Sequence, residues 1–141
     1  MDVISSIWPW RAYCFLDDEG NDVIIRWMDR ENISVGDRSV LWSRLILLEE
    51  VGPHALPGSL EHLEDEFWTL SIKARAGGSV LKPILCYGPF YPDREITLLA
   101  GAPMEKGILE PIHLLPIARH NLETLNLNKR RRVPIYANRI A

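Results

Sequence analysis

The hydrophobic positions in the first half of the chain predict one strand followed by two helices. Residues 8–16 are rich in aromatic and apolar side chains and run into an acidic turn, which is typical of a strand. Apolar residues then recur at helical spacing over about residues 20–31. A second helix is predicted from the N-cap candidate Ser34 to the stop at Gly52 and Pro53, because its apolar residues repeat every three to four positions.

In the second half the period of the pattern changes to two, which predicts strands. Apolar and polar side chains alternate over residues 67–75, and the glycine pair at 77–78 is typical of a hairpin turn. Two further strands are expected over residues 80–87 and 94–100. Pro83 cannot donate a hydrogen bond to a neighbouring strand, so the first of these two needs a bulge or an unpaired position there.

A connection, a last helix and a basic tail complete the expected organisation. Residues 53–66 are polar and contain two prolines, which predicts a connecting segment. Pro111 suits the first turn of a helix, and Pro116 requires that this helix either begins nearby or kinks. A basic tail follows at residues 129–141. The order βααβββα predicts a single α+β domain over residues 1–141, with a mostly antiparallel four-stranded sheet packed against helices.

The composition excludes several classes of protein. With 141 residues, 47% of them hydrophobic and 25% charged, the chain is expected to fold as one globular domain. It has no apolar run long enough for a bilayer and no secretory signal, so we expect a cytoplasmic protein with no membrane partner. Cys14 and Cys86 are expected as reduced core residues. No cofactor motif is present and the four histidines lack ligand spacing, so neither a cofactor nor a metal site is predicted.

The net charge of −3 hides a strong asymmetry between the two halves of the chain. Residues 1–70 hold five arginines, no lysine and fourteen acids, whereas residues 71–141 hold eleven lysines and arginines and five acids. A basic half of this kind points to an anionic partner, unless the two halves interleave in space and their charges average out.

Cations of the second half form the candidate site. Lys73 and Arg75 project from one face of a predicted strand, and Lys82 lies on the next one. Like charges placed close together destabilise a sheet unless an anion such as phosphate lies between them. Further candidates are Lys106 in the loop before the last helix, Arg119 and His120 on that helix, and Lys129, Arg130, Arg131 and Arg132 in the tail. The alternative is an ordinary solvated face of lysines and arginines.

The aromatic residues divide into core and surface candidates. Trp27, Trp42 and Trp68 fall on the apolar faces of their predicted elements, which favours positions in the core. Tyr87, Phe90 and Tyr91 lie at the end of a predicted strand and in the loop after it. They are candidates for stacking on nucleic-acid bases, although aromatic residues also anchor loops.

Four segments in order resemble the RelE/ParE toxin superfamily, in particular its HigB-like, phage-derived branch. Residues 63–73 resemble the family's entry strand "L-x-D-x-L-W-E-L-R-I", and residues 82–87 resemble its strand "Y-R-I-L-Y". Residues 94–102 are similar to the strand "I-V-L-L-H-G-F", and Glu105 with Lys106 resembles the "K-K" link before the last helix.

This resemblance implies both a fold and a function. The family fold is a compact α+β domain with two N-terminal helices on a sheet, and its members are toxins of bacterial type II toxin–antitoxin modules. HigB- and RelE-like members are endoribonucleases that cleave mRNA without a metal, usually on the ribosome, and ParE-like members act on DNA gyrase. The implied partners are a cognate antitoxin, mRNA and the ribosome. The alternative is a catalytically inactive or ParE-like binding protein of the same fold.

The resemblance also assigns roles to individual residues. Lys82 takes the place of the arginine in "Y-R-I-L-Y", Lys106 that of a lysine in the link, and Lys73 substitutes for the "E-L-R" arginine, whose own position is Ser71. These three lysines would neutralise phosphate, and His120 is the candidate for proton transfer near neutral pH. The expected RNA contacts are Arg75, Arg119, Tyr87, Lys129, Arg130 and Arg131.

Overall fold

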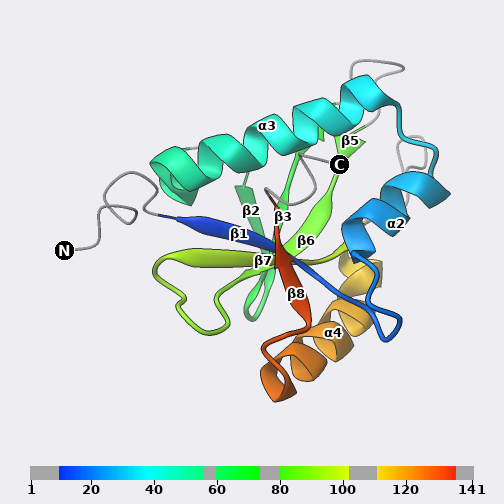
Figure 1. Cartoon of the computed structure of the whole chain (residues 1–141). Helices are drawn as coiled ribbons and strands as arrows, with labels where there is room; N and C mark the ends of the chain where they lie inside the picture. Colours follow the sequence, from blue (N-terminus) through cyan, green and yellow to red (C-terminus); the bar gives the residue numbers. More distant parts are fainter. Residues whose placement is uncertain (1–9, 56–59, 74–79, 102–110, 136–141) are drawn as a thin grey trace.

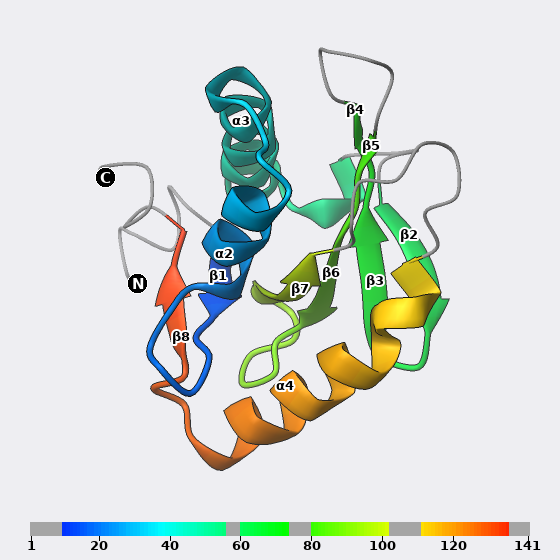
Figure 2. The ribbon, with the colours of Figure 1, turned by 90° about the vertical axis from the view of Figure 1, so that its right-hand side faces the viewer.

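A six-stranded sheet forms the middle of the molecule, and helices cover both of its faces (Figures 1 and 2). The computed structural model describes residues 10–55, 60–73, 80–101 and 111–135. The strands are β1 (Arg11–Phe15), β2 (Leu60–Glu64), β3 (Phe67–Leu70), β4 (Ile72–Lys73), β5 (Val80–Leu81), β6 (Pro83–Tyr87), β7 (Glu95–Gly101) and β8 (Arg132–Pro134). The helices are α2 (Val23–Arg30), α3 (Val35–Val51) and α4 (Leu115–Leu127), with short 3₁₀ turns η1 (Pro53–Ala55) and η2 (Pro111–Leu114). The prediction of a mixed α+β protein is therefore confirmed.

The sheet has the strand order β2-β3-β6-β7-β1-β8, and β4 pairs separately with β5. Neighbouring strands are antiparallel except β1 and β7, which run parallel in the centre. The prediction of four strands was wrong, because β2 and β8 lie at the two edges and were hidden in segments expected as a connection and a tail. Edge strands commonly carry charged residues, so they lack the apolar alternation that marks a strand.

Capping side chains define the starts of helices α2 and α3, and a glycine ends α3. The Asp22 carboxylate caps α2 by accepting from the backbone N–H groups of Ile24 and Ile25. The Ser34 hydroxyl accepts from the Asp37 N–H at the start of α3, and Gly52, with a φ of 85°, ends that helix. Both helices predicted in the first half of the chain are therefore present.

Each face of the sheet has its own hydrophobic core. One core lies under α2 and α3 and includes Trp27, Leu45 and Leu98. The other lies under α4 and includes Phe67 and Leu122. Because both faces are covered, the expected alternation of buried and exposed residues along β3 is lost: Phe67, Thr69 and Leu70 are all buried.

Two prolines set local breaks. The strand expected over residues 80–87 is divided into β5 and β6, with Lys82 between them and Pro83 as the first residue of β6. The buried Thr69 hydroxyl donates to the Pro83 carbonyl at 2.9 Å, which satisfies a polar group at this break. Pro116 lies in the first turn of α4, which begins at Leu115, so of the two expected possibilities the helix begins near this proline. Pro111, expected in the first turn of the helix, lies instead in the 3₁₀ turn η2 before it.

Part of the predicted basic tail is integrated into the sheet. Strand β8 pairs with β1, and the Arg132 guanidinium binds Glu95 through two hydrogen bonds of 2.9 and 3.2 Å. The same guanidinium lies 3.8 Å from the centre of the Tyr13 ring and 4.8 Å from that of Phe90. Since the Glu95 side chain is only 4% exposed, this is a buried ion pair with aromatic groups on the cation.

Replacing Arg132 by alanine is expected to lower the free energy of unfolding by about 3–5 kcal/mol, because it leaves the Glu95 carboxylate buried without its counter-ion. Chemical denaturation followed by circular dichroism measures the change. Arg130→Ala is the matched control, since Arg130 is exposed on the adjacent turn, and it should change stability by less than about 0.5 kcal/mol. Equal effects of the two variants would contradict a structural role for the ion pair.

Gly101, the last residue of β7, lies directly against the Trp27 indole. A Cβ atom added at this position would come within 2.0 Å of the Trp27 ring. Any side chain here would therefore push α2 away from the end of β7.

Gly101→Ala is expected to lower the free energy of unfolding by about 1–3 kcal/mol, the usual cost of overpacking a core. Gly36→Ala is the control, because a Cβ at that position of α3 has no atom nearer than 4.0 Å. That change should stabilise the protein by about 0.5–1 kcal/mol, since alanine favours helix over glycine. A stable Gly101→Ala variant would contradict the close packing of α2 on β7.

Candidate functional site

The two predicted lysines of the hairpin lie on the same face of the sheet. Ile72 and Leu81 point into the core under α2 and α3. Successive side chains along a strand point to opposite faces, so Lys73 and Lys82 point to the face that carries α4. Together we call Lys73 and Lys82 the lysine face.

The register of the hairpin makes these lysines neighbours. Lys73 pairs with Val80, and Lys82, which follows the last residue of β5, lies two positions beyond Val80. In a regular sheet this diagonal arrangement corresponds to a separation of about 7–8 Å. Lys73 is exposed and Lys82 is half-buried, and neither forms an ion pair within the part of the chain that the structure describes. The lysine face therefore offers two neighbouring positive charges that no ion pair among the described residues compensates.

Two predicted cations cannot be placed with them. Arg75 and Lys106 lie outside the described residues, and their predicted roles stay predictions.

The predicted residues of α4 lie away from the hairpin. Arg119 forms ion pairs with Glu64 and with Asp65, the latter at 2.8 Å, and its guanidinium lies 5.0 Å from the centre of the Phe67 ring. Hydrogen bonds to Asp65 and Glu64 raise the pKa of Arg119 and compensate its charge. His120 is exposed and lines a cavity of about 110 Å³ together with Asp18 and Arg131. The structure therefore does not group His120 with the lysine face.

Tyr87 points to the opposite face of the sheet from the lysines. Its ring is stacked on Trp68, with ring centres 5.4 Å apart, and also contacts Trp10 at 6.0 Å. Burial raises the pKa of Tyr87, and its hydroxyl is buried with no hydrogen-bond partner among the described residues. The ring is thus part of an aromatic cluster on the side of α3.

The basic residues before β8 have different environments. Lys129 lies 5.2 Å from the centre of the Phe90 ring, and Arg130 is exposed. Arg131 donates hydrogen bonds to the Leu16 carbonyl and to the Asp18 carboxylate. Arg131 therefore connects the start of β8 to the turn after β1.

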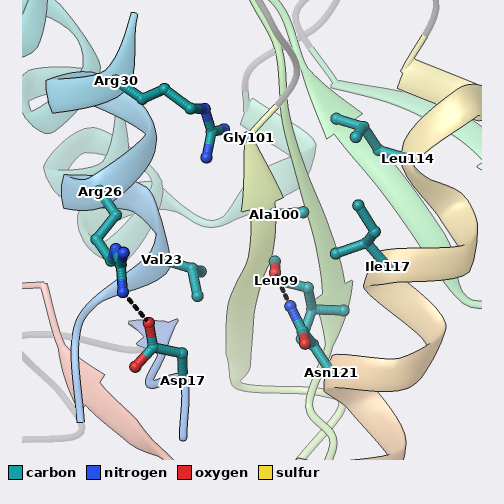
Figure 3. Close-up of a pocket in the computed structure, with 10 residues that line it drawn as sticks. All are labelled: Asp17, Val23, Arg26, Arg30, Leu99, Ala100, Gly101, Leu114, Ile117 and Asn121. Atoms are coloured by element: carbon teal, nitrogen blue, oxygen red, sulfur yellow. Dashed lines mark hydrogen bonds and ion pairs between the residues drawn. The ribbon is translucent and has the colours of Figure 1, made fainter. Parts of the chain in front are cut away.

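A cavity between α2 and α4 was not predicted from the sequence (Figure 3). It has a volume of about 250 Å³, and its walls include Arg26 and Arg30 of α2, Gly101 of β7, and Ile117 and Asn121 of α4. The only feature of the sequence that relates to this cavity is the spacing of four residues between Arg26 and Arg30, which places both arginines on one side of a helix. Nothing in the sequence indicates that α4 lies opposite that side.

The two cysteines are buried in the described part of the molecule. Burial raises the pKa of the Cys86 thiol to about 12 and that of Cys14 well above its usual range, so both remain protonated at neutral pH. No cluster of three or more histidine, cysteine, aspartate or glutamate side chains that could hold a metal ion is found among the described residues.

A comparison with protein families and with curated proteins finds no match to either. In the described ranges, no helix combines the length and the apolar character needed to cross a bilayer.

Both cysteines are expected to resist Ellman's reagent at pH 8 in the folded protein, because their thiols are buried and their pKa values are raised. Both should react within minutes in 6 M guanidinium chloride, which provides the control for total thiol content. Rapid reaction of either cysteine under native conditions would contradict its position in the core.

Proposed function

We propose that the protein is a toxin of a type II toxin–antitoxin module that binds and cleaves mRNA at the lysine face. The observation that carries this proposal is the position of Lys73 and Lys82 on one face of the hairpin, with no ion pair to either lysine in the described part of the chain. The sequence resemblance to HigB- and RelE-like toxins supports it, because these lysines occupy or adjoin positions that the family fills with arginine.

The proposed reaction uses the chemistry of RNA itself. The 2′-hydroxyl attacks the adjacent phosphorus, the bond to the 5′-oxygen breaks, and the products carry a 2′,3′-cyclic phosphate and a 5′-hydroxyl. Negative charge builds up on the phosphoryl oxygens in the transition state, and Lys73 and Lys82 would stabilise it electrostatically. One proton leaves the 2′-hydroxyl and another reaches the 5′-oxygen, which requires a group that exchanges protons near neutral pH.

A second candidate function is a binding protein without nuclease activity, either ParE-like or catalytically inactive. The placement of His120 favours this candidate, because it lies beside Asp18 and Arg131 rather than on the lysine face. Such a protein would still use the two lysines to bind phosphate or an acidic partner.

The antitoxin is the expected regulatory partner under either function. Because the net charge of the chain is −3, nonspecific attraction to nucleic acid is weak and the basic site is local. We expect the antitoxin to present acidic groups to the lysine face and so to compete with RNA.

The double substitution Lys73→Ala and Lys82→Ala is expected to lower mRNA cleavage by about 10²–10³-fold, because it removes cations that stabilise the transition state. It should also reduce the slope of log affinity against log salt by about 1.4, since each lost contact to a single-stranded phosphate accounts for about 0.7. Cleavage is measured on a 5′-labelled mRNA with and without translating ribosomes, and binding by fluorescence anisotropy.

Arg44→Ala is the matched control, because Arg44 is an exposed cation on α3 with no ion pair in the described structure. This variant should cleave and bind like the wild type. Cleavage unchanged by the double substitution would overturn the nuclease assignment. Binding that depends on the lysines, without any cleavage by the wild type, would establish the second candidate instead.

A further inference from the structure

The cavity between α2 and α4 exists because β7 extends further than β1. The last paired residues of these strands are Cys14 and Leu98, whereas β7 continues to Gly101. The end of β7 is therefore not covered by β1, and the side chains of α2 and α4 form opposite walls over it (Figure 3).

The wall formed by α2 carries positive charge. The Arg26 guanidinium is held by Asp17 at 2.9 Å, so its charge is largely compensated. Arg30 is only weakly paired, at 3.7 Å from Glu31, and its side chain is 64% exposed. Figure 3 shows its guanidinium directed towards Gly101. Arg26 also lies 3.6 Å from Glu19, so the two arginines face three acidic neighbours. The ion pair of Arg30 is the longest of the three, so Arg30 is the cation of this wall most available to the phosphate of a phosphodiester.

The wall formed by α4 is apolar. Ile117 is 52% exposed although it is a large aliphatic residue, and it borders the cavity with Leu114. A volume of about 250 Å³ is below the roughly 300–1,000 Å³ typical of sites for drug-sized ligands. The cavity can thus hold a single flat ring system against Ile117, which gains from apolar contact and stacking.

Asn121 supplies a fixed hydrogen-bonding group at the bottom of this wall. Its side-chain nitrogen donates to the Leu99 carbonyl at 2.8 Å, next to the bulge between β6 and β7. This bond orients the amide, so the side-chain oxygen remains as an acceptor. An acceptor at this point favours a ring that carries an amino group.

The cavity is adjacent to the lysine face. Gly101 pairs with Pro83, the residue that follows Lys82, across two neighbouring strands. The cavity opens at the edge of β7 that β1 leaves uncovered, and Lys82 precedes the strand on the other side of β7, so the width of this one strand separates them.

We propose that the α2–α4 cavity is a nucleotide subsite for the RNA bound at the lysine face. Its phosphodiester contacts Arg30, its base lies against Ile117, and the Asn121 oxygen accepts a hydrogen bond from an adenine or cytosine amino group. This inference rests on the proposed function, and it predicts a preference for adenine and cytosine over uracil next to the bound phosphates.

The test measures binding of 5′-labelled octamers of adenylate, cytidylate and uridylate by fluorescence anisotropy, at one fixed salt concentration. Arg30→Ala and Ile117→Asp should each weaken binding of the adenylate octamer by about tenfold, through loss of a charged contact and of base stacking. Asn121→Ala should bring the affinities for the adenylate and uridylate octamers to within about twofold of each other.

Leu127→Asp and Arg44→Ala are the controls, because Leu127 is 90% exposed at the far end of α4 and Arg44 lies on α3. Both should bind like the wild type, and circular dichroism confirms that each variant is folded. If Arg30→Ala and Ile117→Asp bind normally while the lysine variant does not, the subsite is overturned and the proposed function stands.

If the wild type binds no octamer, the proposed function fails, and adenosine monophosphate then tests the cavity independently. A chemical shift perturbation of residues around Gly101 that is lost in Arg30→Ala would support a nucleotide site. Absence of any perturbation at millimolar adenosine monophosphate would overturn it.

Discussion

The Glu95 carboxylate joins three segments that are distant in the sequence, and the centre of the sheet depends on it. It accepts hydrogen bonds from the backbone N–H groups of Phe90 and Tyr91 and from the Arg132 guanidinium. These bonds close the connection between β6 and β7 and hold β8 beside β1. A carboxylate on a side chain that is only 4% exposed is tolerated only when its oxygens are satisfied, as they are here. Glu95 therefore constrains the position of the turn after β6 and the position of β8 beside β1.

Coverage of both faces of the sheet determines which surface is free for function. Helix α4 occupies the face to which Lys73 and Lys82 point, but β4 and β5 form a separate pair outside the six-stranded sheet (Figure 2). The two lysines thus belong to the hairpin extension, while Phe67 and Ile84, further along the same face, are buried under α4. The proposed site lies at the edge of the part of this face that α4 covers.

The ends of the helices could be predicted from the sequence because they depend on residues within one turn. The Ser34 cap, the Gly52 stop and Pro116 marked helix ends correctly because each acts within its own turn. Strands β2 and β8 were missed because their pairing depends on distant partners: Arg132 is a sheet residue only because Phe15 and Glu95 lie beside it. For the candidate site, the shared face of Lys73 and Lys82 followed from strand periodicity. The cavity did not, because the sequence of α2 contains no information about the position of α4.

The pairing of β1 with β7 and β8 has a consequence for synthesis. Strand β1 leaves the ribosome first, yet its partners are Glu95–Leu98 on one side and Arg132–Pro134 on the other. At about 5–20 residues per second, translation from Phe15 to Arg132 takes roughly 6–23 s. During this time the edge of β1 that pairs with β8 has no native partner. Pairing at such sequence separation also slows folding through loop-closure entropy. The nascent chain thus acquires its complete six-stranded sheet only after β8 has been translated, and until then a chaperone or another protein can bind the unpaired edge of β1.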